Sequence, residues 1–159
     1  MVPKERIASL DIFKGLSQKE IEEIARLCEE VVFHDGDRVL SEGKRAEYFF
    51  LLEQGSVDLR FELPYRETSK EMTVTTIKPG ECFGWSAMVS PYKATLSCYS
   101  IGNSRAIRIR GDEILGLCER NNHIGFIFMQ NLAEMIGNRL TKQRAQFIKE
   151  VGDSLRFQW

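Results

Sequence analysis

FGWSAMVSPYKATLS, residues 83–97, places a glycine before a short helical turn, followed by a proline, a lysine and the start of a strand. Backbone N–H groups at the start of such a turn carry a partial positive charge, and Gly84 lets an anion approach them closely. The pattern alone is not specific, because many Phe-Gly loops bind nothing. It predicts a small anion-binding cradle, and the rest of the sequence must show whether that cradle holds a ligand.

The bulk composition indicates one folded domain over residues 1–159, since 43% of the residues are hydrophobic and 28% are charged. A formal net charge of −1 provides no global field that attracts nucleic acid or an anionic membrane. No apolar run is long enough for a signal peptide or a bilayer span. We therefore expect a cytoplasmic protein with neither nucleic acid nor membrane as a partner.

The residue types that carry metal or covalent chemistry are scattered along the chain. Its cysteines are Cys28, Cys82, Cys98 and Cys118. They form no CxxC pair, and His34 lies far from His123, so no metal site and no required cofactor are expected. Ser86, His123 and Asp112 could be named as a catalytic triad, but no spacing brings them together. The sequence predicts a protein that is not an enzyme.

Hydrophobic periodicity divides the chain into three zones. Residues 5–30 repeat apolar side chains at spacings of three and four and contain a capping box, Ser17 to Glu20, so N-terminal helices are predicted. Residues 31–109 change to a period of two in short segments separated by glycines such as Gly55. Short, regularly punctuated strands of this kind predict an antiparallel β jelly roll, and hence an α+β fold. Residues 111–151 are predicted to be helical.

The last helix carries an apolar seam over residues Ile136, Leu140, Phe147 and Val151. A long terminal helix with such a seam usually needs a partner, so we expect a homodimer through these side chains. The alternative is that the seam packs on its own β-domain. The basic side chains on this helix are expected to form a solvated face rather than a DNA contact; they are Arg139, Lys142, Arg144 and Lys149.

The order of these parts resembles the cyclic nucleotide-binding domain, which occurs in catabolite activator proteins and in regulatory subunits of cyclic-AMP-dependent kinase. The resemblance covers roughly residues 10–151 and rests on the turn glycines, on Pro79-Gly80-x-x-Phe83-Gly84 and on Ala94-Thr95-Leu96. It implies a double-stranded β-helix with a phosphate-binding cassette at residues 83–97. It also implies that a cyclic nucleotide or another anionic metabolite in this cassette repositions the final helices.

The cassette departs from the family pattern at its two charged ligand contacts. The glutamate that binds the ribose hydroxyl falls on Trp85, and the arginine that pairs with the cyclic phosphate falls on Tyr92. Lys93 stands one position further on, but a lysine cannot form the planar bidentate pair of an arginine. Tight binding of cyclic AMP is therefore not expected. The residues expected to line the site or its edge are Gly84, Trp85, Ser86, Ala87, Tyr92, Lys93, Ala94 and Thr95.

Three functions remain open from the sequence. The first is a regulatory module that senses a small ligand, for which an open pocket beside Trp85 would argue. The second is a ligand-free module for dimerisation or for binding another protein, with the Trp85 indole filling the pocket. The third is the regulatory half of a transcription factor, because the segment after the long helix, which stops at Trp159, is too short for a helix-turn-helix domain.

Overall fold

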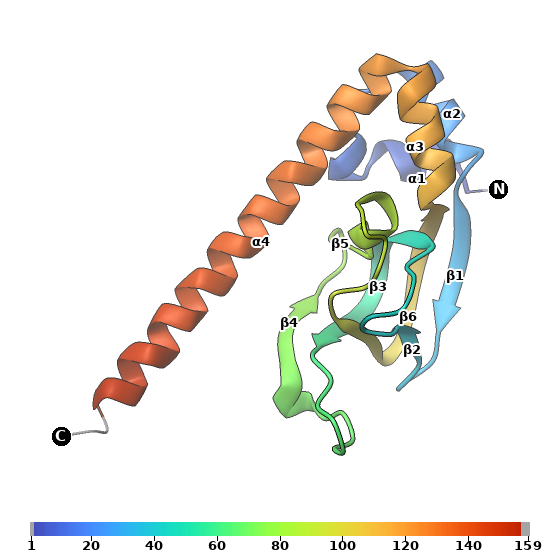
Figure 1. Ribbon diagram of the computed structural model, residues 1–159. Coiled ribbons are helices and arrows are strands. Elements are labelled where there is room, and N and C mark those ends of the chain that lie inside the picture. The colour runs from blue at the N-terminus through green and yellow to red at the C-terminus, as the bar shows by residue number, and fades with distance from the viewer. Residues whose placement is uncertain (1, 157–159) are drawn as a thin grey trace.

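Six antiparallel strands form the sheet of this domain in the computed structural model, which describes residues 2–156. The strands are β1 (Glu29–Phe33), β2 (Arg38–Leu40), β3 (Tyr48–Arg60), β4 (Thr73–Ile77), β5 (Cys82–Phe83) and β6 (Ser97–Arg110). The long strands β3 and β6 pair at the centre, with β1 and β2 beside β6, and with β4 and β5 beside β3 (Figure 1). The expected α+β fold, an antiparallel jelly roll flanked by helices, is confirmed.

Helices precede and follow the sheet. They are α1 (Lys4–Ala8), α2 (Gln18–Ala25), α3 (Gly111–Arg120) and α4 (Asn122–Arg156), with the 3-10 turns η1 (Asp11–Phe13), η2 (Lys70–Met72) and η3 (Trp85–Met88). The predicted capping box begins α2, where the backbone N–H of Ser17 donates to the Glu20 carboxylate at 2.8 Å. Two boundaries differ from those expected. Glu29 already belongs to β1 because it pairs with Arg108 of β6, and α4 continues to Arg156.

Gly55 lies inside β3, although the sequence predicted separate segments on either side of it. Its φ of 86° lies in the left-handed region, and a Cβ atom there would lie 2.7 Å from the Asn103 carbonyl oxygen of β6. The register of β3 against β6 shifts between Leu52 and Gln54 and again between Gln54 and Ser56. The glycine therefore forms a bulge that lets one long strand continue, rather than a turn that ends it.

Strand β3 is buried on both faces because its side chains alternate between two apolar clusters. Phe49 and Leu51 belong to the cluster formed with the helices, whereas Phe50 and Leu52 belong to the cluster inside the roll. Phe128 of α4 packs edge-on against Phe49, with 5.8 Å between the ring centroids. The first half of α4 is thus anchored to the centre of the sheet.

The rest of α4 leaves the domain. Its buried side chains are Ile124, Phe128 and Leu132, all in the first third of its 35 residues. In Figure 1 the helix runs diagonally away from the sheet, and its C-terminal end lies well clear of the other helices. The position of α4 leaves much of its apolar seam exposed.

A close backbone contact joins α3 to the η3 turn. Gly111, the first residue of α3, lies so near Ala87 that an added Cβ atom would stand 2.7 Å from the Ala87 carbonyl carbon. The Gly111 N–H also donates to the Glu47 carbonyl oxygen at 2.9 Å, which fixes its position against the start of β3. Only glycine has room at this junction.

We predict opposite effects for two glycine-to-alanine substitutions. Gly111→Ala forces the α3–η3 junction apart and is expected to lower the free energy of unfolding by about 1–3 kcal/mol, as overpacking usually does. Gly137→Ala, in an open part of α4, is expected to raise it by up to about 1 kcal/mol, because alanine favours the helix. Urea denaturation of both variants provides the measurement, and equal effects would contradict the close contact.

Candidate functional site

The cassette is shaped by a left-handed glycine between β5 and η3. Gly84 has a φ of 76°, and a Cβ atom on it would lie 2.7 Å from the Tyr48 carbonyl oxygen and 3.0 Å from the Phe50 ring. Phe83, immediately before it, stacks on Phe50 with 4.8 Å between the ring centroids. Aromatic packing thus anchors the chain up to Gly84, and the glycine turns it into η3 against the inner wall of the roll.

The cassette encloses very little free space. Its cavity measures about 30 Å³. The walls are formed by Leu40, Leu59, Gly84, Trp85, Ser86, Ala94, Thr95, Leu96, Cys98 and Arg139. Pockets for small-molecule ligands have roughly 300–1,000 Å³. In this conformation the cassette has no room for a nucleotide.

Arg139 of α4 is the site residue that sequence reasoning missed. Its guanidinium reaches the cassette cavity and donates to the Cys82 carbonyl oxygen. The prediction of a solvated face is wrong for Arg139, whereas Lys142 and Arg144 are indeed exposed. Arg139 follows Ile136 by three residues and therefore lies on the same side of the helix. This spacing was the one feature of the sequence that could have predicted that Arg139 faces the domain.

No carboxylate among residues 2–156 forms an ion pair with Arg139. Its charge nevertheless affects the pKa values of two buried thiols, Cys82 and Cys98. Burial raises the pKa of Cys82 to about 11 and that of Cys98 to about 12, and the Arg139 guanidinium opposes both shifts. The two thiols are therefore protonated at neutral pH, and neither is an activated nucleophile.

Trp85 and Ser86 lie side by side on η3. Trp85 is half-buried, and it packs against the apolar cluster on the helix side while also lining the cassette cavity. Ser86 is only 7% exposed, and its hydroxyl forms no hydrogen bond within residues 2–156. The Ser86 and Thr95 hydroxyls and the Arg139 guanidinium are therefore the polar side-chain groups on an otherwise mainly apolar wall.

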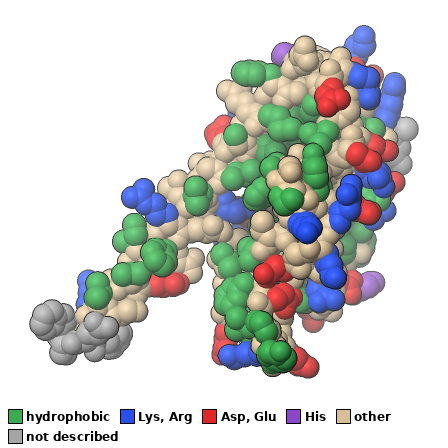
Figure 2. All heavy atoms as spheres, in the orientation of Figure 1, with side chains coloured by type: hydrophobic (Ala, Val, Ile, Leu, Met, Phe, Trp, Pro, Cys, Tyr) green, Lys and Arg blue, Asp and Glu red, His purple; other side chains and the backbone are tan. Residues whose placement is uncertain are grey.

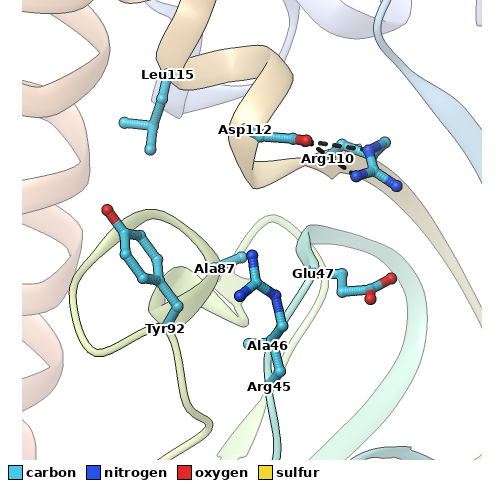
Figure 3. A pocket seen from close by; sticks show the side chains of 8 residues that line it. All are labelled: Arg45, Ala46, Glu47, Ala87, Tyr92, Arg110, Asp112 and Leu115. Carbon is cyan, nitrogen blue, oxygen red and sulfur yellow. Dashed lines mark hydrogen bonds and ion pairs between the residues drawn. The ribbon is translucent and has the colours of Figure 1, made fainter.

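Three of the expected site residues lie outside the cassette cavity. Tyr92 and Ala87 line a separate cavity of about 260 Å³, and Lys93 is exposed and lines neither cavity (Figure 3). Tyr92 turns away because its backbone is not extended: φ is 60°. Its N–H donates to the Val89 carbonyl oxygen, and its own carbonyl accepts from the Ala46 N–H, each at 2.9 Å. The alternation expected for an extended segment does not apply here.

Residues 2–156 contain neither a cluster of metal-binding side chains nor a helix suited to span a membrane. No three side chains of histidine, cysteine, aspartate or glutamate in that range gather closely enough to hold a metal ion. Nor does any helix in that range combine the length and apolar character needed to cross a bilayer.

The geometry agrees with the comparisons with known proteins. The profile of the cyclic nucleotide-binding domain matches residues 30–121, which is more than half of the chain. The chain therefore belongs to the cyclic nucleotide-binding domain family. A protein of Geobacter metallireducens GS-15, described as cyclic nucleotide-binding, has a similar structure with a TM-score of 0.77 and 28% identity, over 88% of this chain and 99% of that one.

More distant relatives share the fold or part of the sequence. The catabolite activator protein of Thermus thermophilus superposes with a TM-score of 0.67 at 19% identity, over 89% of this chain and 63% of that one. The cAMP-dependent protein kinase regulatory subunit of Mucor circinelloides is 27% identical over 124 residues, 73% of this chain and 28% of the subunit. A cGMP-dependent protein kinase of Drosophila melanogaster is 28% identical over 82 residues, 52% of this chain but only 9% of the kinase.

Arg139 should contribute to stability in a way that its exposed neighbour Arg144 does not. Arg139→Ala removes the hydrogen bond to Cys82 and enlarges the cassette cavity, so the free energy of unfolding should fall by about 1–2 kcal/mol. Arg144→Ala should change it by less than about 0.5 kcal/mol, as is usual for an exposed side chain. Chemical denaturation of the two variants measures the difference, and equal values would contradict a role for Arg139 in closing the cassette.

Proposed function

We propose that this domain is a non-catalytic regulatory module whose cassette does not bind cyclic AMP or cyclic GMP tightly and whose output passes through α4. The observation that carries the proposal is the volume of the cassette cavity, about 30 Å³. Trp85 and the Arg139 guanidinium are the two largest side chains that line this small cavity. This supports the ligand-free interaction module over a sensor of cyclic nucleotides.

The chemistry of the cassette supports the same conclusion. Trp85 and Tyr92 stand where the family pattern has the ribose-binding glutamate and the phosphate-binding arginine, and Tyr92 lines another cavity. Each charge-assisted hydrogen bond is worth about 1.5–3 kcal/mol. Losing both weakens binding by roughly a hundredfold to tens of thousandfold. Lys93 offers no replacement, because it does not line the cassette cavity.

A second candidate function, a sensor of a compact anion, is favoured by one observation. The Arg139 guanidinium donates to a neutral carbonyl and has no carboxylate partner among residues 2–156. A guanidinium forms shorter and stronger hydrogen bonds with an anion than with a carbonyl. A compact oxyanion could therefore compete for Arg139, in a cavity that the Ser86 and Thr95 hydroxyls also line.

The partner that we propose for α4 is a second copy of the chain. Large apolar side chains are exposed along its projecting half: Leu140, Phe147, Ile148, Val151 and Leu155. Figure 2 shows hydrophobic side chains along this part of the molecule, with lysine and arginine beside them. Apolar surface of this extent is typical of an interface. A twofold axis would bring the same face of each helix together, and each would cover the other.

Titration calorimetry with cyclic AMP and cyclic GMP tests the first part of the proposal. We expect both nucleotides to bind at least a hundredfold more weakly than they bind the Mucor regulatory subunit under the same conditions. The reason is that two lost charged contacts cost roughly 3–6 kcal/mol of binding free energy. Submicromolar binding of either nucleotide would contradict the closed cassette.

Inorganic phosphate, titrated separately, tests the second candidate function, a sensor of a compact anion. Saturable binding that Arg139→Gln abolishes would support this function, and no binding would reject it.

Two phenylalanine substitutions on α4 test the dimer. Phe147→Glu, in the projecting half, should convert the dimer to a monomer or raise its dissociation constant by roughly 10- to 100-fold, because a buried side chain of this size is worth about 1.5–3 kcal/mol. Phe126→Glu is the control, since Phe126 is 66% exposed and Phe147 65%, and both lie on α4. Light scattering across a concentration series gives the mass, and a wild-type monomer at all concentrations would reject the dimer.

A further inference from the structure

A second cavity lies next to the cassette, where three segments meet. It measures about 260 Å³ and lies between the loop before β3, the chain after η3 and the first turns of α3. The side chains that matter most are Arg45, Ala87, Tyr92, Arg110, Asp112 and Leu115 (Figure 3). Tyr92 lines this cavity, whereas Trp85 lines the cassette cavity.

Arg45, an exposed residue, brings a positively charged guanidinium to this cavity, which Glu47 and Asp112 also line. Figure 3 shows its guanidinium pointing into the space between the Tyr92 ring and the start of α3, while the Glu47 side chain points the other way. Within residues 2–156, Arg45 forms no ion pair and no side-chain hydrogen bond. The nearby acid, Asp112, is already occupied: Arg110 donates to it twice, at 3.0 and 2.9 Å.

Tyr92 supplies a flat apolar wall at some conformational cost. A φ of 60° is unfavourable for a bulky side chain, and the backbone hydrogen bonds to Val89 and Ala46 hold the residue there. Strained residues of this kind cluster at binding sites, where the surrounding structure fixes them. In Figure 3 the Tyr92 ring rises toward Leu115.

We propose that this second cavity binds a small aromatic acid, meaning one ring that carries a carboxylate or a phosphate. Arg45 would pair with the oxyanion, while Tyr92 and Leu115 would enclose the ring. The volume, about 260 Å³, lies just below the usual range of roughly 300–1,000 Å³ for ligand sites, which suits a ligand with a single ring. The site is separate from the cassette and does not depend on whether the cassette is closed.

A ligand in this place would touch two elements that already share a tight junction. Ala87 of η3 lines the cavity and also meets Gly111 at the start of α3. Asp112 and Leu115, on the first turns of α3, line the opposite side. Binding would therefore affect the position of α3, and of α4 after it, relative to the β-roll.

Phenyl phosphate and benzoate are the probes, with inorganic phosphate as the bare-ion control, each titrated into the full chain and followed by amide chemical shifts. We expect saturable shifts at Ala87, Tyr92 and Leu115 for at least one aromatic acid, and weaker binding of phosphate alone. Arg45→Gln should weaken that binding by roughly tenfold or more, as expected for a charge-assisted contact. Tyr92→Gly, which removes both the ring and the strain, should also weaken it.

Arg144→Gln, which removes an exposed arginine from α4, should leave the affinity unchanged, and urea denaturation checks that Arg45→Gln remains folded. Three outcomes would overturn the proposal. The first is that neither aromatic acid saturates the protein up to about 10 mM, at the weak end of measurable affinity. The second is that Arg45→Gln and Arg144→Gln lose equal amounts of affinity. The third is that the amide chemical shifts change only at Trp85, Ser86 and Thr95. The last outcome would assign the binding to the cassette and would bear on the proposed function instead.

Discussion

The two-sided burial of β3 is the constraint on which the other parts of this domain depend. Side chains of one strand point alternately to opposite faces, so Phe49 contacts the helices while Phe50 contacts the interior of the roll. Phe128 ties α4 to the first face, and Phe83 ties the cassette to the second. A shift of one residue in β3 would exchange the two faces and detach both α4 and the cassette.

The cassette is also joined directly to each of the two final helices, α3 and α4. Gly111 brings the start of α3 against Ala87 of η3, and Arg139 reaches back from α4 to the Cys82 carbonyl oxygen. Both contacts require a specific position of the final helices. If a ligand or partner of α4 changes the cassette through these contacts, a change in the cassette affects α4 by the same free energy. This reciprocity is thermodynamic and holds whichever site is occupied.

Membership of the family defines the fold of this chain more firmly than its ligand. The same roll and helices are shared with proteins at 16–28% identity, whereas the two charged ligand contacts that the resemblance implies would fall on Trp85 and Tyr92. A fold of this kind is retained as long as its apolar alternation and turn glycines remain. Recognition of a ligand, by contrast, depends on a few side chains that can change without unfolding the domain.

The sequence by itself determined the elements and the local geometry, because these depend on neighbours along the chain. Period-two alternation predicted the strands, the capping box from Ser17 predicted the start of α2, and Gly84 predicted the turn of the cassette. Only the tertiary structure decided which side chains meet. Arg139 lies 57 residues from Cys82. Tyr92 has a positive φ, and its carbonyl oxygen accepts a hydrogen bond from the distant Ala46 N–H. No local pattern records contacts that form only when the helices pack against the roll.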